Sequence, residues 1–491
     1  MTDKFPIILW LRQNLRLSDN AALTWAAGRG PVIPLYILDE SGDPWAPGGA
    51  SKWWLNETLA DLAESFKKLG APLILRRGKP EKILRELAKE TDAKTITWQR
   101  IYEPFHCKQD GKLANDLEEA GFEIQIHPGF LLFEPEPIKT GGGTPFKVYT
   151  PFSKACFAAP APGKTLPAPK KLESISGIKS DNLKDWKLVP RSAVWPKGLA
   201  DAWTPGEAAA HDRLKDFLSE ILAHYKTGRD RPDKDYTSRL SPYLHFGNIS
   251  PRQVWHAVQF ALAKTPSLGN NAERYLLELL WREFSWHLLF HIPDLPTEPL
   301  NKSFAKFPWK HDVKSLKAWQ QGMTGYPIVD AGMRQLWHTG WMHNRVRMIV
   351  ASFLIKDLLI DWREGAAWFW DTLVDADLGN NTASWQWVAG CGADASPYFR
   401  IFNPTLQGEK FDPNGDYVRE WVPELARLDA AIIHSPWKAP TANLAKAGVV
   451  LGKTYPHPIV DHGKARERAL EALKQTKSAA PQATETNDLF D

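Results

Sequence analysis

Cysteine is scarce in this chain of 491 residues. The three cysteines, Cys107, Cys156 and Cys391, are odd in number and far apart. Domains stabilised by disulfides carry an even number of closely spaced cysteines instead. The sequence therefore indicates a reducing compartment, the cytoplasm, and a chain that buries a large core without disulfides or structural metal ions.

Long hydrophobic runs are also missing. No stretch reaches the roughly 18 apolar residues that a membrane-spanning helix requires. The apolar run Phe5–Leu11 is short, and Arg12 and Arg16 follow it, whereas a secretory signal places its positive charges first. We therefore expect a buried strand here, and a soluble protein with no export signal and no membrane partner.

Two kinds of ligand motif are absent from the sequence. No Gly-x-Gly-x-x-Gly pattern follows the first predicted strand, no P-loop lysine is found, and Gly141–Gly143 follows no strand–helix turn. The histidines are scattered, and no cluster of Cys, His and Asp has ligand spacing, so we predict no metal site even at the neighbouring Asp375 and Asp377. The net charge of +4 neither requires nor excludes nucleic acid, because a basic groove can coexist with acidic faces.

Tryptophan, in contrast, is abundant, with 23 residues. An indole ring is costly to bury unless its N–H finds a hydrogen-bond partner. One interpretation is a large core that uses tryptophan as packing. The other is a site that needs indole rings for stacking or electron transfer. Composition by itself favours the first interpretation.

The first part of the chain alternates strand-like and helix-like segments, which predicts an α/β domain with a doubly wound parallel sheet. Gly70 and Gly121 follow two of the helical segments and are typical of helix C-caps. The predicted strands are Ile7–Leu11, Pro31–Leu38, Leu73–Arg76, Thr95–Trp98 and Glu123–His127. The predicted helices between them are Ser51–Leu69, Pro80–Lys89 and Lys108–Ala120.

The rest of the chain changes in character twice. Prolines mixed with Lys, Ser and Gly predict a surface linker over residues 134–203, after an α/β domain over residues 1–133. Helical periodicity then dominates, which predicts an all-α domain over residues 204–476. The polar residues 477–491 are predicted to form a disordered tail.

Four clusters in the helical part carry polar or aromatic residues suited to ligands. Thr237–Ser241 offers hydroxyls just before a predicted helix at Pro242, which suits a phosphate but also an N-capping segment. Glu278, Trp281 and Arg282 share a face of the apolar helix Ala272–Phe290, which indicates either buried groups that need partners or a Glu–Arg pair beside a core indole. The other two clusters are Trp341–Met348 and Asp375–Trp387.

Taken together and in this order, these clusters resemble the photolyase/cryptochrome family, and the resemblance covers nearly the whole chain. The matching segments are Leu11–Asn20, Thr237–Ser241, Leu280–Phe284, Gly325–Asp330, Gly340–Met348, Asp375–Trp387 and Phe399–Pro404.

The resemblance implies a bent FAD buried in the helical domain. It implies that Arg347 and Asp375 pair against the flavin ring, and that Asn381, where plant cryptochromes carry a carboxylate, lies beside the flavin N5. The residues that it assigns to the cofactor are Tyr225, Thr237, Ser238, Arg239, Leu240, Ser241, Arg282, Arg347, Asp375, Asp377 and Asn381.

The resemblance also implies a substrate, DNA that contains pyrimidine dimers, and a catalyst that flips the lesion out of the duplex. Trp281 and Trp387 would stack on the dimer, Glu278 and Asn344 would bind its edges, and Met348 would close the pocket. Family members that act on (6-4) photoproducts have histidines in place of Asn344 and Met348, so cyclobutane dimers are expected. The residues assigned to the DNA backbone are Arg229, Arg345, Arg400 and Gln407.

The expected reaction is light-driven electron transfer from reduced FAD to the dimer, with Trp309, Trp362 and Trp385 as an electron relay to the surface. Arg12, Lys52 and Glu103 would bind an antenna chromophore, either a deazaflavin or methenyltetrahydrofolate, although the domain could also hold none. A monomer without an obligate protein partner is expected. The alternative function is that of a cryptochrome-like blue-light photoreceptor; a general flavin oxidoreductase is disfavoured because no nicotinamide fingerprint exists.

Overall fold

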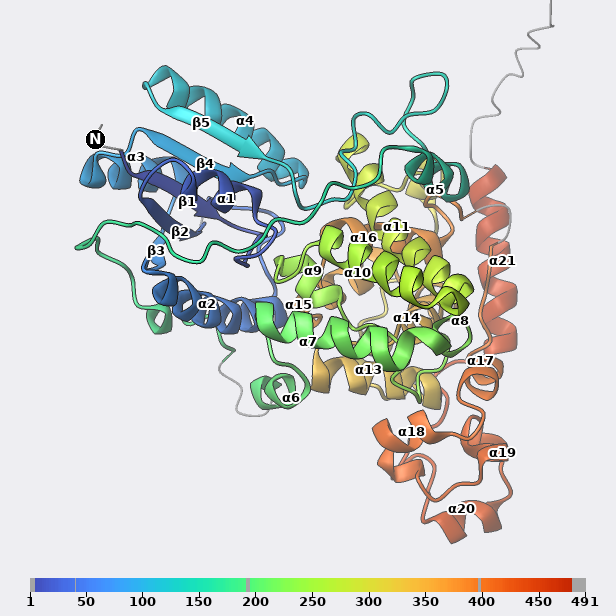
Figure 1. Cartoon of the computed structure of the whole chain (residues 1–491). Helices are drawn as coiled ribbons and strands as arrows, with labels where there is room; N and C mark the ends of the chain where they lie inside the picture. The colour runs from blue at the N-terminus through green and yellow to red at the C-terminus, as the bar shows by residue number, and fades with distance from the viewer. Residues whose placement is uncertain (1–4, 40, 191–194, 396–398, 479–491) are drawn as a thin grey trace, which may run out of the picture. The chain divides into compact units, whose positions relative to one another are not determined.

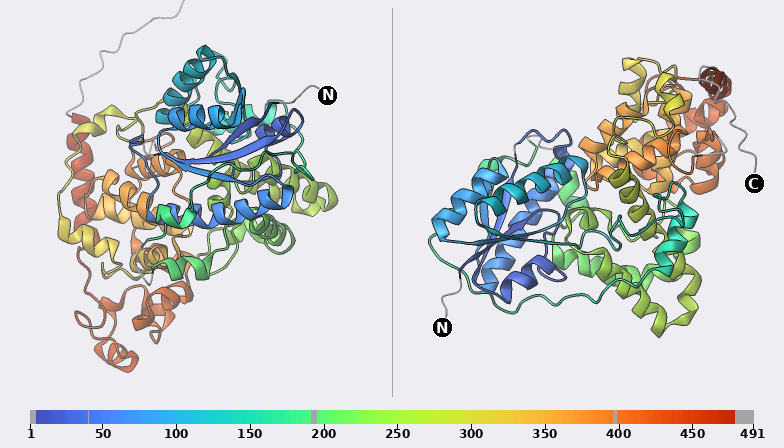
Figure 2. Two further views of the ribbon diagram at one scale, coloured as in Figure 1. Left: turned by 90° about the vertical axis from the view of Figure 1, so that its left-hand side faces the viewer. Right: turned by 90° about the horizontal axis from the view of Figure 1, so that it is seen from above.

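Five short strands form a parallel sheet in the computed structural model, which describes residues 5–39, 41–190, 195–395 and 399–478 (Figure 1). The strand order β3-β2-β1-β4-β5 confirms the predicted doubly wound sheet, and Figure 2 shows helices on both of its faces. The strands are β1 Ile7–Leu11, β2 Val32–Leu38, β3 Ile74–Arg77, β4 Thr95–Gln99 and β5 Glu123–His127. The helices among them are α1 Ala21–Ala27, α2 Gly49–Leu69, α3 Pro80–Thr91 and α4 Pro104–Glu119.

The central strand β1 pairs with both β2 and β4, and Ile8 lies beside Ile33 on one side and Ile96 on the other. All three side chains are fully buried in the core of the sheet. Such continuously apolar strands are typical of a parallel sheet that is covered on both faces. Gly70 ends α2 at a φ of 91°, which confirms its C-cap role, because this left-handed conformation strains any residue with a Cβ.

The segment between the sheet and the later helices follows the sheet closely. Backbone N–H groups of Asp19 and Val32 donate to the carbonyls of Leu166 and Glu173, each at 2.7 Å. Two helices that the sequence did not predict lie in this segment, α5 Tyr149–Ala158 and α6 Trp195–Ala202. The proline pattern indicated a loop correctly over much of the segment but concealed both helices.

By internal contacts the chain divides into two compact units that differ from the predicted domains. Unit 1 comprises Met1–Pro293, Gln335–Met342 and Trp368–Thr382. Unit 2 comprises Asp294–Arg334, His343–Ala367 and Ala383–Asp491. Each unit is therefore assembled from separate stretches of sequence.

Unit 1 joins the sheet to the first helices of the helical part through buried polar contacts. The Arg16 guanidinium donates to the Gly247 carbonyl at 3.0 Å, and Arg252 pairs with the buried Asp19 at 2.8 Å. Gly247 has a φ of 67°, and a Cβ there would lie 2.1 Å from the Gln13 carbonyl oxygen, so the close approach requires glycine. The longer helices of this part are α7 Glu207–Asp216, α10 Pro251–Lys264 and α11 Gly269–His291, with the short α8 Tyr225–Gly228 and α9 Ser241–Phe246.

Unit 2 is helical throughout its described part apart from loops and one isolated bridge, Leu451–Tyr455. Three helices cross between the units along the chain, α13 Pro327–Thr339, α15 Trp362–Thr372 and α16 Leu378–Ala389. The others in unit 2 are α12 Val313–Gln320, α14 Asn344–Ser352, α17 Pro404–Phe411, α18 Asp416–Trp421, α19 Ala430–Ile433, α20 Thr441–Ala447 and α21 His462–Ser478.

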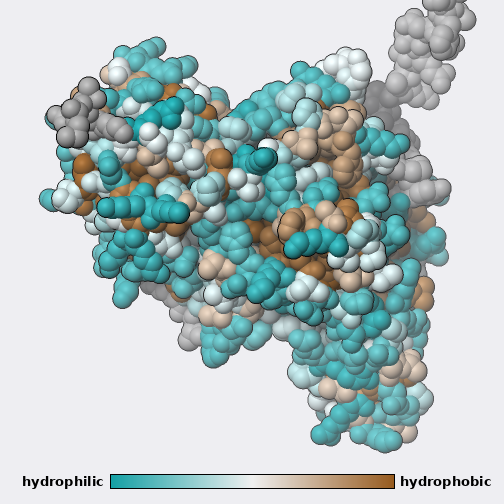
Figure 3. Space-filling model, viewed as in Figure 1, coloured by the Kyte–Doolittle hydropathy of each residue, from teal (hydrophilic) through white to brown (hydrophobic). Residues whose placement is uncertain are grey.

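The predicted tail begins within the last turn of α21, which extends to Ser478, and its remaining residues 479–491 lie outside the described part of the chain. Among the helices that the structure describes, none is long and apolar enough to cross a membrane. Hydrophilic residues dominate the face shown in Figure 3, with hydrophobic residues gathered over the helices around α10 and α11.

Candidate functional site

The predicted phosphate segment Thr237–Ser241 is held from behind by an arginine. The Arg213 guanidinium donates to the carbonyls of Thr237 and Ser238 at 2.7 and 2.8 Å. These bonds fix the backbone of the segment. Arg239 has a φ of 50°, pairs with Asp235 at 3.0 Å and lies over the Trp341 ring at 5.0 Å.

The hydroxyl segment meets the predicted Asp375 in unit 1. The Ser241 hydroxyl donates to Asp375 at 2.6 Å, so one predicted cofactor residue positions another. Leu240 is buried directly before α9, and Tyr225 is buried against Tyr275, with the ring centroids 5.2 Å apart. Burial raises the pKa of the Tyr225 hydroxyl, which therefore stays neutral.

Asp377, two residues further, is a buried carboxylate whose charge is stabilised. Its Oδ2 accepts from the Trp286 indole at 3.0 Å, and its Oδ1 accepts from the Asn380 backbone at 2.8 Å. Burial would raise the pKa of Asp377, but the neighbouring His245 and Arg282 outweigh it and hold the pKa below its usual value. Asn381 follows in the first turn of α16, where its N–H donates to the Asp377 carbonyl.

Arg282 supplies an unsatisfied donor to the same unit. Its Nη1 bonds Phe130 and Glu283, and its Nη2 is buried with no hydrogen-bond partner among the described residues. Such a buried donor usually binds a water or a ligand. The Arg282 donor and the hydroxyls of Thr237–Ser241 fit the phosphates of a dinucleotide such as FAD, and the carboxylates Asp375 and Asp377 fit its ribose hydroxyls as acceptors. Burial also raises the pKa of Glu283 to about 7, although Arg282 opposes this.

Glu278 and Arg229, predicted for lesion and DNA backbone respectively, form an ion pair with each other. Arg274 adds a second pair to the Glu278 carboxylate at 2.8 Å. Burial would lower the pKa of Arg229, but the bond to Glu278 and its charge raise it instead. The alternative of a Glu–Arg helix pair is thus realised, with Arg274 rather than Arg282 as the helical partner.

Trp281 lies one turn further along α11 and is stacked on Tyr149. The two ring centroids are 3.6 Å apart and the rings are nearly parallel, at 7°. The Tyr149 hydroxyl donates to the Leu277 carbonyl at 2.5 Å, which fixes the stack to the helix. Trp281 remains partly exposed, so Tyr149 acts as a rigid backing for an indole that can still be contacted.

In unit 2, Asn344 is the exposed first residue of α14, and Arg347 and Met348 are partly buried on the same helix. His343 caps the helix by accepting from the Arg345 N–H at 3.2 Å. The Arg345 guanidinium lies 4.4 Å from the centre of the Phe411 ring and reaches the Met348 sulfur. Arg347 and Asp375 belong to different units, so their pairing stays a prediction.

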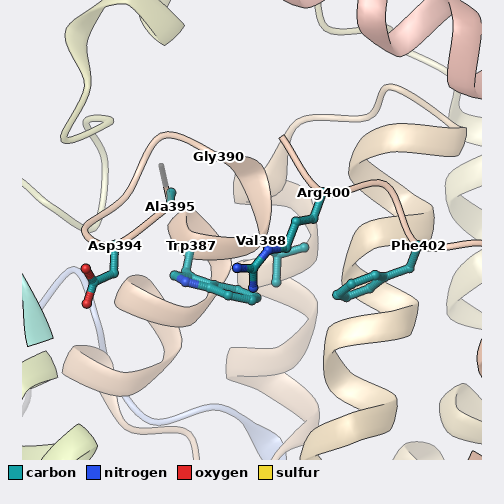
Figure 4. A pocket seen from close by; sticks show the side chains of 7 residues that line it. All are labelled: Trp387, Val388, Gly390, Asp394, Ala395, Arg400 and Phe402. Atoms are coloured by element: carbon teal, nitrogen blue, oxygen red, sulfur yellow. The ribbon is translucent and has the colours of Figure 1, made fainter. Parts of the chain in front are cut away.

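A small pocket in unit 2 contains Trp387 and Arg400. The Arg400 guanidinium lies over the Trp387 ring, 5.4 Å from its centre (Figure 4). Val388, Gly390, Asp394, Ala395 and Phe402 complete the lining. Gln407 is partly exposed on α17, which follows this segment along the chain.

A buried lysine, Lys356, contacts Ala389 and Phe399, which are next to residues of this pocket in the sequence. The Lys356 ammonium donates to the Ala389 carbonyl at 3.0 Å and lies 3.0 Å from the centre of the Phe399 ring. Burial lowers the pKa of Lys356 well below its ordinary value.

The three tryptophans predicted to form an electron relay all lie in unit 2, where two are buried and the third is partly exposed. Trp385 and Trp362 are 3% and 1% exposed, whereas Trp309 is partly exposed. The Trp385 ring packs against Gly365 of the helix that begins at Trp362. The N–H of Lys310, next to Trp309, donates to the Leu359 carbonyl at 2.7 Å, three residues before Trp362.

The three residues predicted to bind an antenna chromophore lie in unit 1 and differ in their contacts and exposure. Arg12 forms two bonds to Asp110, at 2.8 and 2.6 Å, while Lys52 is exposed on α2. Glu103 is buried beside His106, which sequence reasoning missed although the two residues are spaced for one face of a helix turn.

Comparison with known protein families gives separate matches for the α/β part and for the helical part of the chain. Residues 7–170 match the family described as DNA photolyase, and residues 275–475 match the FAD binding domain of DNA photolyase. The chain is 54% identical to the deoxyribodipyrimidine photo-lyase of Agrobacterium fabrum, over 96% of this chain and 98% of that protein. It is 38% identical to cryptochrome-2 of Arabidopsis thaliana, over 96% of this chain and 79% of that protein.

A solved structure is also similar to this chain over nearly its whole length. The crystal structure of a bacterial class III photolyase from Agrobacterium tumefaciens matches with a TM-score of 0.95 and 53% identity, covering 97% of this chain and 99% of the other. Because the aligned region spans nearly the whole length of both chains, the match includes the overall fold and the FAD-binding domain. The chain belongs to the photolyase/cryptochrome family.

Proposed function

We propose that this protein uses light to split cyclobutane pyrimidine dimers in DNA, with FAD as its catalytic cofactor. The observation that carries the proposal is the 54% identity, over almost all of both chains, to a protein named deoxyribodipyrimidine photo-lyase. The donor set around Arg282, Asp375 and Ser241 supports the cofactor. The stacked Trp281 and the charged Glu278 on the same helix support a flat, polar-edged substrate.

FAD would supply the electron that light drives to the dimer, and the residues of this chain would hold both partners in place. The hydroxyls of Thr237, Ser238 and Ser241 would bind its phosphates. The carboxylates Asp375 and Asp377 would bind its ribose and ring N–H groups. Because Asp377 is already held by Trp286 and Asn380, it would orient the cofactor without changing its own position.

The lesion would be held by two indoles and two polar groups. Trp281, backed by Tyr149, and Trp387, below Arg400, would stack on the flipped bases. Glu278 and Asn344 would bind the base edges. Asn344 and Met348 stand where (6-4) enzymes of the resembled family have histidines, which favours the cyclobutane dimer.

The electron relay gives a prediction of its own. Trp309→Phe should slow light-driven reduction of oxidised FAD strongly, because phenylalanine is much harder to oxidise than the indole at the exposed end of the relay. Repair by protein that has been reduced chemically beforehand should be unchanged. Absorption spectra during illumination measure the first, and dimer loss measures the second.

Trp337→Phe is the matched control for that experiment. Trp337 is also exposed, at 46%, but it is stacked between Trp195 and Trp368 in unit 1 rather than placed in the relay. If Trp309→Phe and Trp337→Phe reduce FAD equally fast, the relay tryptophans are packing residues.

The proposed function is tested directly with purified, chemically reduced protein and an oligonucleotide that contains one cyclobutane dimer. Near-ultraviolet or blue light should restore intact pyrimidines, and the dark sample should keep the dimer. Binding should weaken as salt increases, because arginines that contact phosphates release counterions. Equal dimer content in the lit and dark samples would exclude repair.

A second candidate is a blue-light photoreceptor. It is favoured by the 40% identity to cryptochrome-1 of Arabidopsis thaliana, over 95% of this chain and 70% of that protein. In that case FAD should still undergo light-driven reduction while the dimer content stays constant. The same two samples therefore separate the candidates.

A further inference from the structure

We propose that Asp43, Glu103 and His106 form a binding site for a divalent transition-metal cation of the zinc type in the α/β part of unit 1. The three ligand atoms lie within 4.8 Å of one another, although Asp43 is distant from the other two in sequence. This site is separate from the residues assigned to FAD and to the lesion, but it shares Glu103 with the set predicted to bind an antenna chromophore. It also revises the expectation from the sequence that the chain has no metal-ligand cluster.

The two distances from His106 to the carboxylates match those between ligands around a bound ion. His106 Nε2 lies 3.1 Å from an oxygen of Asp43 and 3.4 Å from an oxygen of Glu103. Ligands at Zn–N and Zn–O distances of about 2.1 Å are separated by roughly 3.0–3.4 Å along the edges of an octahedron or tetrahedron. An ion can therefore enter with small side-chain movements and keep at least one position open to water.

The second oxygen of each carboxylate is already held by another group. Gln13 Nε2 donates to Glu103 Oε1 at 3.0 Å, and the Trp45 N–H donates to Asp43 Oδ1 at 2.8 Å. These bonds leave Glu103 Oε2 and Asp43 Oδ2 directed at His106. Such outer hydrogen bonds orient the ligands in established metal sites.

The fold places the cluster where open α/β sheets bind ligands. The strand order reverses between β1 and β4, and Gln13 and Glu103 follow the carboxyl ends of these two strands. The crevice at such a reversal is the usual ligand position in this architecture.

The charges at the site call for a cation. Glu103 is 7% exposed, and two carboxylates face one imidazole. Arg12 forms two hydrogen bonds to Asp110, which compensate its charge.

The experiment is a calorimetric titration of chelator-treated, full-length protein with Zn²⁺ at neutral pH, repeated with Co²⁺ and read by its visible absorption. One ion per chain is expected. His106→Gln and Glu103→Gln should each weaken binding at least tenfold. Gln13→Leu, which removes only the outer hydrogen bond, should weaken it by roughly 10-fold to 100-fold.

His211→Ala is the matched control, because His211 pairs with Glu207 at 3.9 Å on the surface without a third ligand. It should leave binding unchanged, and circular dichroism should show that all variants are folded. The absence of saturable Zn²⁺ or Co²⁺ binding to the parent protein would overturn the proposal and leave a protonated His106 as the counter-charge. Equal binding by parent and His106→Gln would overturn it as well.

Discussion

Replacing Gly365 by alanine should destabilise the protein by about 3 kcal/mol, although the change from glycine to alanine inside a helix normally stabilises by roughly 0.5–1 kcal/mol. A Cβ at position 365 would lie 2.1 Å from the Trp385 ring and 2.7 Å from Leu354 Cδ2. All three residues are buried in unit 2, so neither neighbour can move outward cheaply.

The same substitution should also slow light-driven FAD reduction, because the displaced ring belongs to Trp385, the most inward relay residue of the proposal. Thermal unfolding measures the first effect and illumination of oxidised protein the second. Gly111→Ala is the control, since Gly111 is exposed inside α4 with no heavy atom within 4 Å of its Cβ position. That variant should melt slightly higher than the parent; a Gly365→Ala protein that did the same would show that the contact is not rigid.

Glu278→Ala should lower the repair yield by on the order of tenfold or more, since hydrogen bonds to charged groups contribute about 1.5–3 kcal/mol. The carboxylate would no longer bind the dimer edge. Arg229, whose side chain is only 14% exposed, and Arg274 would both lose their acidic partner. FAD content should remain near one per chain, because Glu278 is not among the residues proposed to hold it.

Two further variants separate the causes of that loss. Glu278→Gln keeps a hydrogen-bonding side chain without the charge, and should retain more repair than Glu278→Ala. Glu273→Ala removes an exposed glutamate from the same helix and should change nothing. Full repair by Glu278→Ala would remove Glu278 from the proposed mechanism, and loss of FAD would mean that it acts on the fold instead.

The sequence predicted those features of the fold that depend on neighbouring residues. Apolar runs and their glycine boundaries located all five strands within two residues, and Gly70 identified the end of α2. The contacts that define unit 1 could not be predicted in this way. The Arg16–Gly247 and Asp19–Arg252 bonds join residues more than 230 positions apart, and no local periodicity encodes them.

The candidate site could likewise be predicted only where its residues are close in sequence. The clusters in the helical part could be singled out because their members are close in sequence. The Arg229–Glu278 pair could not, since it depends on how α8 packs against α11. His106 was missed as a candidate site residue for a similar reason: it lies in α4, whereas its partner Asp43 is far earlier in the sequence.

Some of the tryptophans are core packing residues, whereas others are proposed to act in stacking or electron transfer. Several indoles outside the proposed site are packing residues whose N–H groups have acceptors in the protein: Trp54 donates to Asn248, Trp203 to the Thr339 carbonyl, and Trp319 to the Val350 carbonyl. The high tryptophan content therefore does not by itself indicate a site. The roles proposed for Trp281, Trp387 and the relay depend on their positions.

Because unit 1 is completed by Gln335–Met342 and Trp368–Thr382, it cannot finish folding while the ribosome is still making the middle of the chain. The first N–H of α2, at Gly49, donates to Asp371, which lies 322 residues later. At about 5–20 residues per second, the nascent helix would wait roughly 15–65 s for that acceptor. The five strands would therefore emerge early while unit 1 remains incomplete during translation, so chaperone occupancy should fall only after Thr382 leaves the exit tunnel.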